Sequence, residues 1–238
     1  MPVTARLSDL LIAVIAAIAI AGCGDLVADP VDEPDSAPPA ARNGTPAARD
    51  GERPGGGAAL AALERLAVKG RAPKTGYDRE QFGGDWTSRD GCDTRARILT
   101  RDLRGLAYRA GGACDIASGV LEDPYTRKVI RFRVGGPSEV DIDHVVALGD
   151  AWQKGAQQWG YQRRVRFAND PLNLLAVDAS ANRQKGDGDA ATWLPPNKRF
   201  RCAYVARQIA VKRRYRAWVT VAERDAMARV LARCPGRR

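Results

Sequence analysis

The stretch that decides the fold is residues 140–186, VDIDHVVALGDAWQKGAQQWGYQRRVRFANDPLNLLAVDASANRQKG. Its first residues, Val140 to Asp143, alternate between apolar and acidic side chains. This alternation predicts a half-buried strand with its acidic side chains on the polar face. His144 follows directly and is the only histidine among the 238 residues. Any reaction that needs an imidazole therefore has one candidate side chain.

The end of the stretch predicts a second strand and a short helix. Residues 171–177, PLNLLAV, have the apolar character of a short strand. Residues 180–185, SANRQK, are typical of a short helix, which Gly186 ends. The unit is therefore expected to run strand, strand, helix, with His144 at the end of its first strand.

This unit resembles the core of the HNH (ββα-metal) endonucleases. The resemblance is carried by the pair Asp143 and His144, by Asn173 before a leucine, and by an Asn-x-x-Lys-Gly run that begins nine residues later at Asn182. The wider chain, about residues 77–234, is similar to secreted members that share an Asp-His-Val-Val-x-Leu core and a Trp-Leu-Pro-Pro segment. The last position of the motif is Asn here, which makes the site a His-Asn-Asn variant.

The resemblance implies an α+β fold with a ββα-metal core at residues 139–186, surrounded by helices. In that site His144 is the general base, since a neutral imidazole with an ordinary pKa of about 6.5 can accept a proton at working pH. Asp143 and Asn182 hold one divalent metal ion through oxygen atoms, which hard cations prefer. Magnesium is the favoured ion, with manganese or zinc as alternatives. The side chain of Asn173 bonds to the backbone near His144 and fixes the imidazole.

One geometric condition follows from strand structure. Adjacent residues of a strand point to opposite sides, so Asp143 and His144 serve one site only if the strand bends or ends there. Asp141 on the same strand has two interpretations, an acid that supports the site from behind or a solvent-facing residue, and we expect the second.

Three basic residues are the candidates for binding substrate phosphate. Lys185 and Arg183 belong to the expected short helix, and Arg95 belongs to an expected helix over residues 92–106. A solvated helix face is the simpler interpretation of such arginines.

The charge of the chain is compatible with an anionic partner. The net charge is +10, and residues 171–238 alone hold 15 Lys and Arg against 5 Asp and Glu. Such a surface attracts nucleic acid or anionic lipid, although a well-solvated surface in an arginine-rich proteome is an alternative.

We expect a metal-dependent endonuclease acting on DNA, with RNA as a second candidate. Because phosphate contacts carry no sequence information, its sequence specificity is expected to be low.

Two other functions fit the same sequence. The first is a non-catalytic surface lipoprotein that binds polyanions. The second is an enzyme that cleaves a different phosphodiester, such as a teichoic-acid-like polymer. Loss of cleavage with retained polyanion binding after substitution of His144 separates an enzyme from a binding protein.

The cysteines indicate disulfides in an oxidising compartment. Apart from Cys23 the chain has four, at long spacings and with no Cys-x-x-Cys, which argues against a zinc cluster. Four cysteines allow three pairings. We favour the pairing that closes two short loops, Cys92 with Cys114 and Cys202 with Cys234.

The first residues predict export. Arg6 precedes an apolar run, Leu10 to Ile20, that is too short to span a bilayer comfortably. The run leads to Ala-Gly-Cys23, which resembles a bacterial lipobox; an ordinary secretory signal with an accidental cysteine is the alternative. Acyl chains on Cys23 would anchor the protein to a membrane. We therefore expect a signal at residues 1–23 and a cell-surface lipoprotein or an extracellular protein.

The remaining expectations concern the rest of the chain. Residues 24–57 are rich in Pro, Ala and Gly and are expected to be a disordered linker before a nuclease domain at residues 58–238. Trp152 and Trp159 are expected in the core, and Trp193-Leu194-Pro195-Pro196 as a rigid strap. Further expected elements are helices at 58–69, 92–106, 148–159 and 200–216, a last helix capped by Thr220, a basic loop at 163–166, and a strand at 129–134 that forms a hairpin with the strand of His144.

Overall fold

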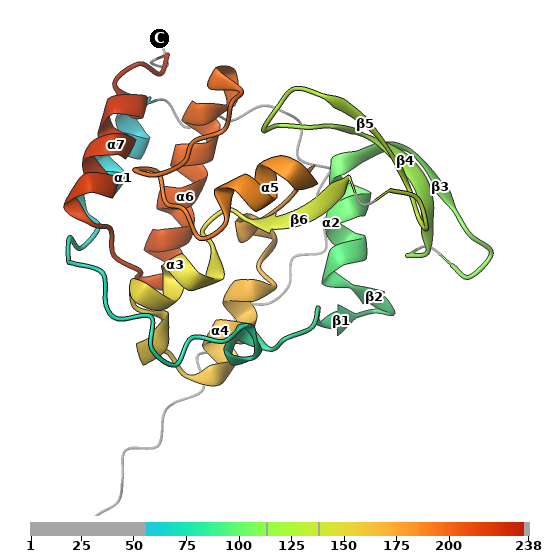
Figure 1. Cartoon of the computed structure of the whole chain (residues 1–238), viewed down its shortest axis with the longest axis horizontal. Helices are drawn as coiled ribbons and strands as arrows, with labels where there is room; N and C mark the ends of the chain where they lie inside the picture. Colours follow the sequence, from blue (N-terminus) through green and yellow to red (C-terminus); the bar gives the residue numbers. More distant parts are fainter. Residues whose placement is uncertain (1–55, 113, 138, 236–238) are drawn as a thin grey trace, which may run out of the picture. The chain divides into compact units, whose positions relative to one another are not determined.

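The computed structural model describes residues 56–112, 114–137 and 139–235. The predicted export signal, Cys23 and nearly all of the predicted linker lie outside these residues. Within the described part of the chain, helices and small antiparallel sheets alternate along the sequence (Figure 1). The predicted α+β class is confirmed. None of the helices in these ranges is both long enough and apolar enough to cross a membrane.

The strands form three separate antiparallel sheets within the described ranges, with the orders β1-β2, β3-β4-β5 and β6-β7. The strands are β1 Ser88–Arg89, β2 Cys92–Asp93, β3 Leu103–Tyr108, β4 Ile116–Glu122, β5 Val129–Arg133, β6 Val140–His144 and β7 Leu174–Asp178. The α-helices are α1 Gly56–Glu64, α2 Thr94–Asp102, α3 Leu148–Gln153, α4 Tyr161–Ala168, α5 Ala179–Lys185, α6 Arg201–Tyr215 and α7 Val221–Leu231.

The predicted strand, strand, helix unit is present. Strands β6 and β7 pair from Val140 opposite Asp178 to His144 opposite Leu174, and α5 follows β7 directly (Figure 1). The carboxylate of Asp178 accepts a hydrogen bond from the Ala181 amide at 2.8 Å and caps α5. Residues 171–173, predicted as part of the second strand, instead form a short 3₁₀ turn before it.

The predicted hairpin between the strand at 129–134 and the strand of His144 is wrong. Strand β5 pairs with β4, and β6 pairs with β7. The sequence did not lead us to expect β4, which buries Leu121 opposite Ile130 and so gives β5 its partner. The turn after β5 therefore carries the chain from one sheet to another.

The bounds of three predicted helices also differ from the prediction. The helix expected at 92–106 ends at Asp102, because Leu103 is extended and packs on Gly119 of β4, where a Cβ would lie only 3.1 Å from the Leu103 Cβ. The helix expected at 58–69 ends at Glu64. The helix expected at 148–159 is interrupted at Gly155, whose φ of +123° is a conformation that favours glycine.

The basic segment expected as a loop at 163–166 is helical and belongs to α4. Phe167 in this helix is fully buried and packs edge-on against Tyr215, with ring centroids 5.0 Å apart. The guanidinium groups of Arg163 and Arg164 donate to the carbonyls of Tyr215 and Gln81. An apolar anchor and these backbone contacts hold the segment as a helix.

The core and the disulfides agree with the expectations. Trp152 and Trp159 are buried in one apolar cluster, as predicted. Cys92 pairs with Cys114, and Cys202 pairs with Cys234, so the favoured pairing is confirmed.

The Cys202–Cys234 disulfide joins the start of α6 to the segment after α7 and closes a loop with a sequence separation of 32. Replacing both cysteines with alanine is expected to lower the free energy of unfolding by about 3–4 kcal/mol, because the unfolded chain regains loop entropy. Urea titration of the oxidised protein and the double variant measures this difference. A loss below about 1 kcal/mol would show that the bridge constrains the unfolded chain less than this loop length implies.

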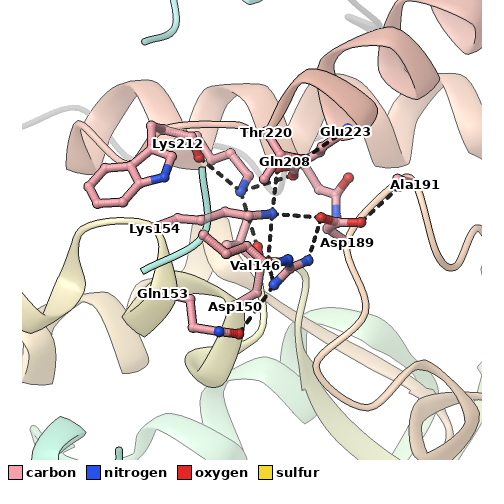
Figure 2. Close-up of polar contacts among 12 residues, drawn as sticks. Val146, Asp150, Gln153, Lys154, Asp189, Ala191, Gln208, Lys212, Thr220 and Glu223 are labelled. Atoms are coloured by element: carbon pink, nitrogen blue, oxygen red, sulfur yellow. Dashed lines mark hydrogen bonds and ion pairs between the residues drawn. The ribbon is translucent and has the colours of Figure 1, made fainter. Parts of the chain in front are cut away.

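A buried network of ion pairs connects α3, α6, α7 and the segment after α5 (Figure 2). Lys154 Nζ lies 2.6 Å from Asp150 and from Glu223 and 2.7 Å from Asp189. Lys212 Nζ lies 3.1 Å from Asp150 and 2.9 Å from Glu223. All five side chains are at most 2% exposed. The network thus fixes the helices around the core through charges that must stay paired.

The cap predicted at Thr220 is present, since its hydroxyl accepts a hydrogen bond from the Glu223 amide at 3.1 Å. The Glu223 side chain does not return to the cap but lies in the ion network with Lys154 and Lys212.

Candidate active site

Three of the residues singled out in the sequence meet in one cleft. A cleft of about 180 Å³ is lined by Asp143, His144 and Asn182, together with Arg79 and Asp187. Strand β6 supplies the first two and ends at His144, and α5 supplies the third. Asp143 and His144 still pair with Leu175 and Leu174 in the ladder, and β6 ends at His144, where both residues line the cleft.

His144 is held in one tautomer by its surroundings. Its Nε2 atom lies 2.9 Å from the carbonyl oxygen of Ala168, which can only accept a hydrogen bond, so Nε2 carries the proton and Nδ1 keeps its lone pair. The indole of Trp86 stacks on the imidazole at 5.6 Å between centroids. Burial lowers the pKa of His144 to about 4, so the ring is neutral near neutral pH. The arrangement presents a neutral, oriented base.

Asn173 ties the chain that follows His144 to the start of β7. Its Oδ1 accepts a hydrogen bond from the Val146 amide at 2.8 Å, and its Nδ2 donates to the Val146 carbonyl at 3.2 Å. The side chain is fully buried. Arg101 and Arg207 donate to the carbonyls of Pro171 and Leu174 on either side of it. The contact with the backbone near His144 that we expected is therefore present, while its part in catalysis stays a prediction.

Replacing Asn173 with alanine is expected to destabilise the protein by about 2–4 kcal/mol, because the buried amide and carbonyl of Val146 each lose a partner. Cleavage should also slow, since the loop after His144 is no longer fixed. Urea unfolding and the cleavage rate of the same preparation measure the two effects. A variant as stable and as active as the parent would show that these bonds do not position the site.

Asp143 is buried and hydrogen-bonded at both carboxylate oxygens. Tyr125 donates its hydroxyl to Oδ2 at 2.5 Å, and Lys185 Nζ lies 2.8 Å from Oδ1. The Lys185 ammonium also donates to the His144 carbonyl at 2.8 Å. Each carboxylate oxygen keeps a second lone pair after one such bond.

The position of Lys185 differs from the phosphate contact that the sequence led us to expect. Its side chain is only 1% exposed, and its ammonium is paired with Asp143. A buried cation needs a carboxylate partner, and this partner could not be identified from the helix alone. Lys185 therefore supports the site from inside.

Asn182 faces the cleft from α5 and contacts Asp141. Its Nδ2 donates to Asp141 Oδ2 at 3.1 Å, and within the described ranges its Oδ1 has no hydrogen-bond partner. Asp141, expected to face solvent, is half-buried and orients Asn182 through this bond. No group of three or more His, Cys, Asp and Glu side chains that could hold a metal occurs in the described part of the chain.

These residues nevertheless fit a hard divalent cation held by few protein ligands. One carboxylate and one amide oxygen, from Asp143 and Asn182, border the same cleft. Such oxygen donors suit magnesium, which usually keeps several waters and binds phosphate oxygens. The set does not resemble a closed zinc site, which needs four nitrogen or sulfur ligands.

Both arginines that were expected to bind phosphate lie away from this cleft. Arg183 is exposed and lines a different hollow, beside Lys128 and Arg131. Arg95 lines a third hollow with Arg109 and Arg133.

The cleft instead has Arg79, an exposed residue of a short 3₁₀ helix, on its border. The sequence does not single out Arg79, because residues 77–90 have the pattern of an irregular loop. The one local signal is Asp78, which caps this short helix through the Glu80 amide. Trp86, whose indole stacks on the His144 imidazole, belongs to the same segment.

Comparison with known proteins identifies relatives of the chain. Residues 93–230 match the family described as GmrSD restriction endonucleases, C-terminal domain. The chain is also 37% identical over 183 residues to an "Uncharacterized secreted protein" of Arthroderma benhamiae, and the match covers 76% of this chain and 87% of that protein. No solved structure matches. The matched segment includes Asp143, His144, Asn182 and Asp187 of the cleft, while Arg79 lies before it. The chain belongs to the family of GmrSD restriction endonuclease C-terminal domains.

Proposed function

We propose that the protein is an HNH-type, metal-dependent endonuclease that hydrolyses phosphodiester bonds of DNA, with RNA as a second candidate substrate. The observation that carries the proposal is the environment of His144. The Ala168 carbonyl holds the proton on Nε2, and Asp143 and Asn182 border the same cleft. Membership of a family named for restriction endonucleases supports a nucleic acid substrate.

In the proposed mechanism His144 accepts the proton of the attacking water at Nδ1. The imidazole stays in place because Ala168 binds its other nitrogen and Trp86 covers one face. Asp143 and Asn182 would hold one divalent ion, with magnesium favoured over manganese or zinc. When bound, such an ion supplies charge neutralisation at the phosphate and at the leaving oxygen.

The substrate would be bound mainly through its phosphates. Arg79 stands at the cleft, and Arg183 and Arg95 are proposed to contact more distant phosphates from the neighbouring hollows. Such contacts weaken with salt and give little sequence preference.

We also propose that the protein acts outside the cytoplasm. Its relative from Arthroderma benhamiae is described as secreted, which supports export. The two disulfides suit an oxidising compartment. Attachment to a membrane through acylated Cys23 is part of this proposal.

The test is incubation of the oxidised full-length chain with supercoiled plasmid in magnesium or in EDTA. Nicking in magnesium and none in EDTA is the expected result, and Asn182→Ala should need a higher magnesium concentration. Plasmid retained by the protein without nicking in magnesium, manganese or zinc would favour the non-catalytic polyanion-binding function instead.

A further inference from the structure

Tyr125 is a buried residue that contacts the proposed site from outside the ββα unit. It lies in the turn between β4 and β5, and its side chain is fully buried. Its hydroxyl donates to Asp143 Oδ2 at 2.5 Å. A phenol is a hydrogen-bond donor at neutral pH, so this contact gives the Asp143 carboxylate a fixed donor on one oxygen.

The turn that carries Tyr125 is itself anchored to the site unit. Asp123 Oδ2 accepts from the Thr126 amide at 2.7 Å, and Asp123 Oδ1 accepts from the Asp178 amide, at the end of β7, at 3.0 Å. The position of the phenol is thereby set relative to the strand that pairs with β6.

The predicted strap at Trp193 to Pro196 completes this support. The Trp193 ring meets the Tyr125 ring edge-on, with centroids 5.1 Å apart. Just beyond the strap, the Asn197 amide donates to the Tyr125 carbonyl at 2.8 Å, and Asn197 Nδ2 donates to the Pro124 carbonyl at 2.9 Å. Both the ring and the backbone of Tyr125 are thus held by residues 193–197.

On the other side of Asp143, Lys185 Nζ lies 2.8 Å from Oδ1. With one donor on each oxygen, the carboxylate cannot rotate without losing a buried hydrogen bond, and its remaining lone pairs keep one direction. Groups that bond to a metal ligand in this way typically change metal affinity about 10–100-fold when removed.

The geometry points to Tyr125 as a positioning residue, held by residues 193–197, that orients Asp143 for a divalent cation in the cleft. This inference rests on the proposed function, because it assigns a supporting group to the same site. It also gives a role to the Trp-Leu-Pro-Pro segment, which the proposed chemistry does not use.

The test compares Tyr125→Phe with Tyr204→Phe in the full-length oxidised chain. Tyr204 is a matched control, because it is equally buried and packs on Tyr125, Trp193 and Phe200. Its hydroxyl bonds to the Val145 carbonyl and to Gln208, and not to Asp143. Calorimetric titration with manganese and with magnesium measures cation affinity directly. Tyr125→Phe should weaken binding about 10-fold or more, and Tyr204→Phe less than about 2-fold.

A second readout is the metal concentration that gives half-maximal plasmid nicking. It should rise for Tyr125→Phe by a similar factor, with the rate largely restored at saturating metal. Asn197→Ala should shift it in the same direction by a smaller factor, since it loosens the turn without removing the phenol. Thermal unfolding shows that each variant is folded.

The results separate the inference from the proposed function. Suppose that the parent nicks plasmid and that folded Tyr125→Phe needs the same metal concentration for half-maximal nicking. This result would overturn the role of Tyr125 and leave the proposed function intact. Equal shifts in Tyr125→Phe and Tyr204→Phe would also overturn it, because general packing would then explain the effect. A parent that neither binds the cation nor nicks plasmid would overturn both.

Discussion

Replacing His144 with alanine is expected to slow the cleavage of a labelled DNA duplex by about 10²–10⁴-fold, the usual contribution of a general base. The structure offers no second imidazole, since His144 is the only histidine in the chain. The Ala168 carbonyl and the Trp86 ring would remain in place with nothing to orient. Single-turnover rates at saturating magnesium measure the effect.

The comparison needs a control for the loss of a buried ring. His144→Ala also removes the stacking partner of Trp86, so circular dichroism and thermal unfolding must show a folded variant. DNA binding in EDTA should change little, because His144 is buried and contributes no charge when neutral. A folded variant that retains more than about a tenth of the parent rate would rule out His144 as the base.

Replacing Lys212 with methionine is expected to destabilise the protein by about 3–5 kcal/mol, the usual result of removing one partner of a buried ion pair. Lys212 is fully buried between Asp150 and Glu223 (Figure 2). Without its ammonium these carboxylates keep only the charge of Lys154 and the more exposed Arg71. Urea unfolding measures the loss.

Arg214→Met, on the same helix, is the matched control. Arg214 pairs with Asp170 at 3.4 Å but its side chain is 62% exposed, so water screens the pair and the expected loss is below about 1 kcal/mol. Similar losses in the two variants would contradict the view that burial of the charges determines the cost.

The same ion network is expected to make the stability of the fold depend on pH. Burial acts to raise the pKa of Asp150, but Lys212 and Lys154 outweigh it and hold the pKa below its ordinary value. Burial also acts to raise the pKa of Asp189, but the hydrogen bond from Lys154 is the main effect that outweighs it and lowers the pKa. Because both pKa values are lower in the folded protein, their contribution to stability is present above about pH 4 and is lost as the pH falls through the folded values. The stability lost on acidification should therefore be smaller in Lys212→Met than in the parent.

The central unit could be predicted because its signals are local. Alternation from Val140 to Asp143, the spacing from Asn173 to Asn182 and the stop at Gly186 all lie within one stretch. The cleft that unites Asp143, His144 and Asn182 agrees with that spacing. The cysteine pairs followed from loop length.

What could not be predicted depends on distant partners. Strand β5 has the alternation of any strand, and nothing local shows that it pairs with β4 rather than β6. Lys185 looks like a surface cation of a short helix until β6 places Asp143 beside it. Tyr125 lies 18 residues before Asp143 in the sequence, in a turn whose composition carries no sign of the contact.

The most direct test of the account measures plasmid nicking by the parent and by His144→Ala, each in magnesium and in EDTA. The account predicts nicking only by the parent in magnesium, because the reaction needs both the oriented imidazole and a cation held at Asp143 and Asn182. Nicking by the parent in EDTA, or equal nicking by His144→Ala in magnesium, would contradict it.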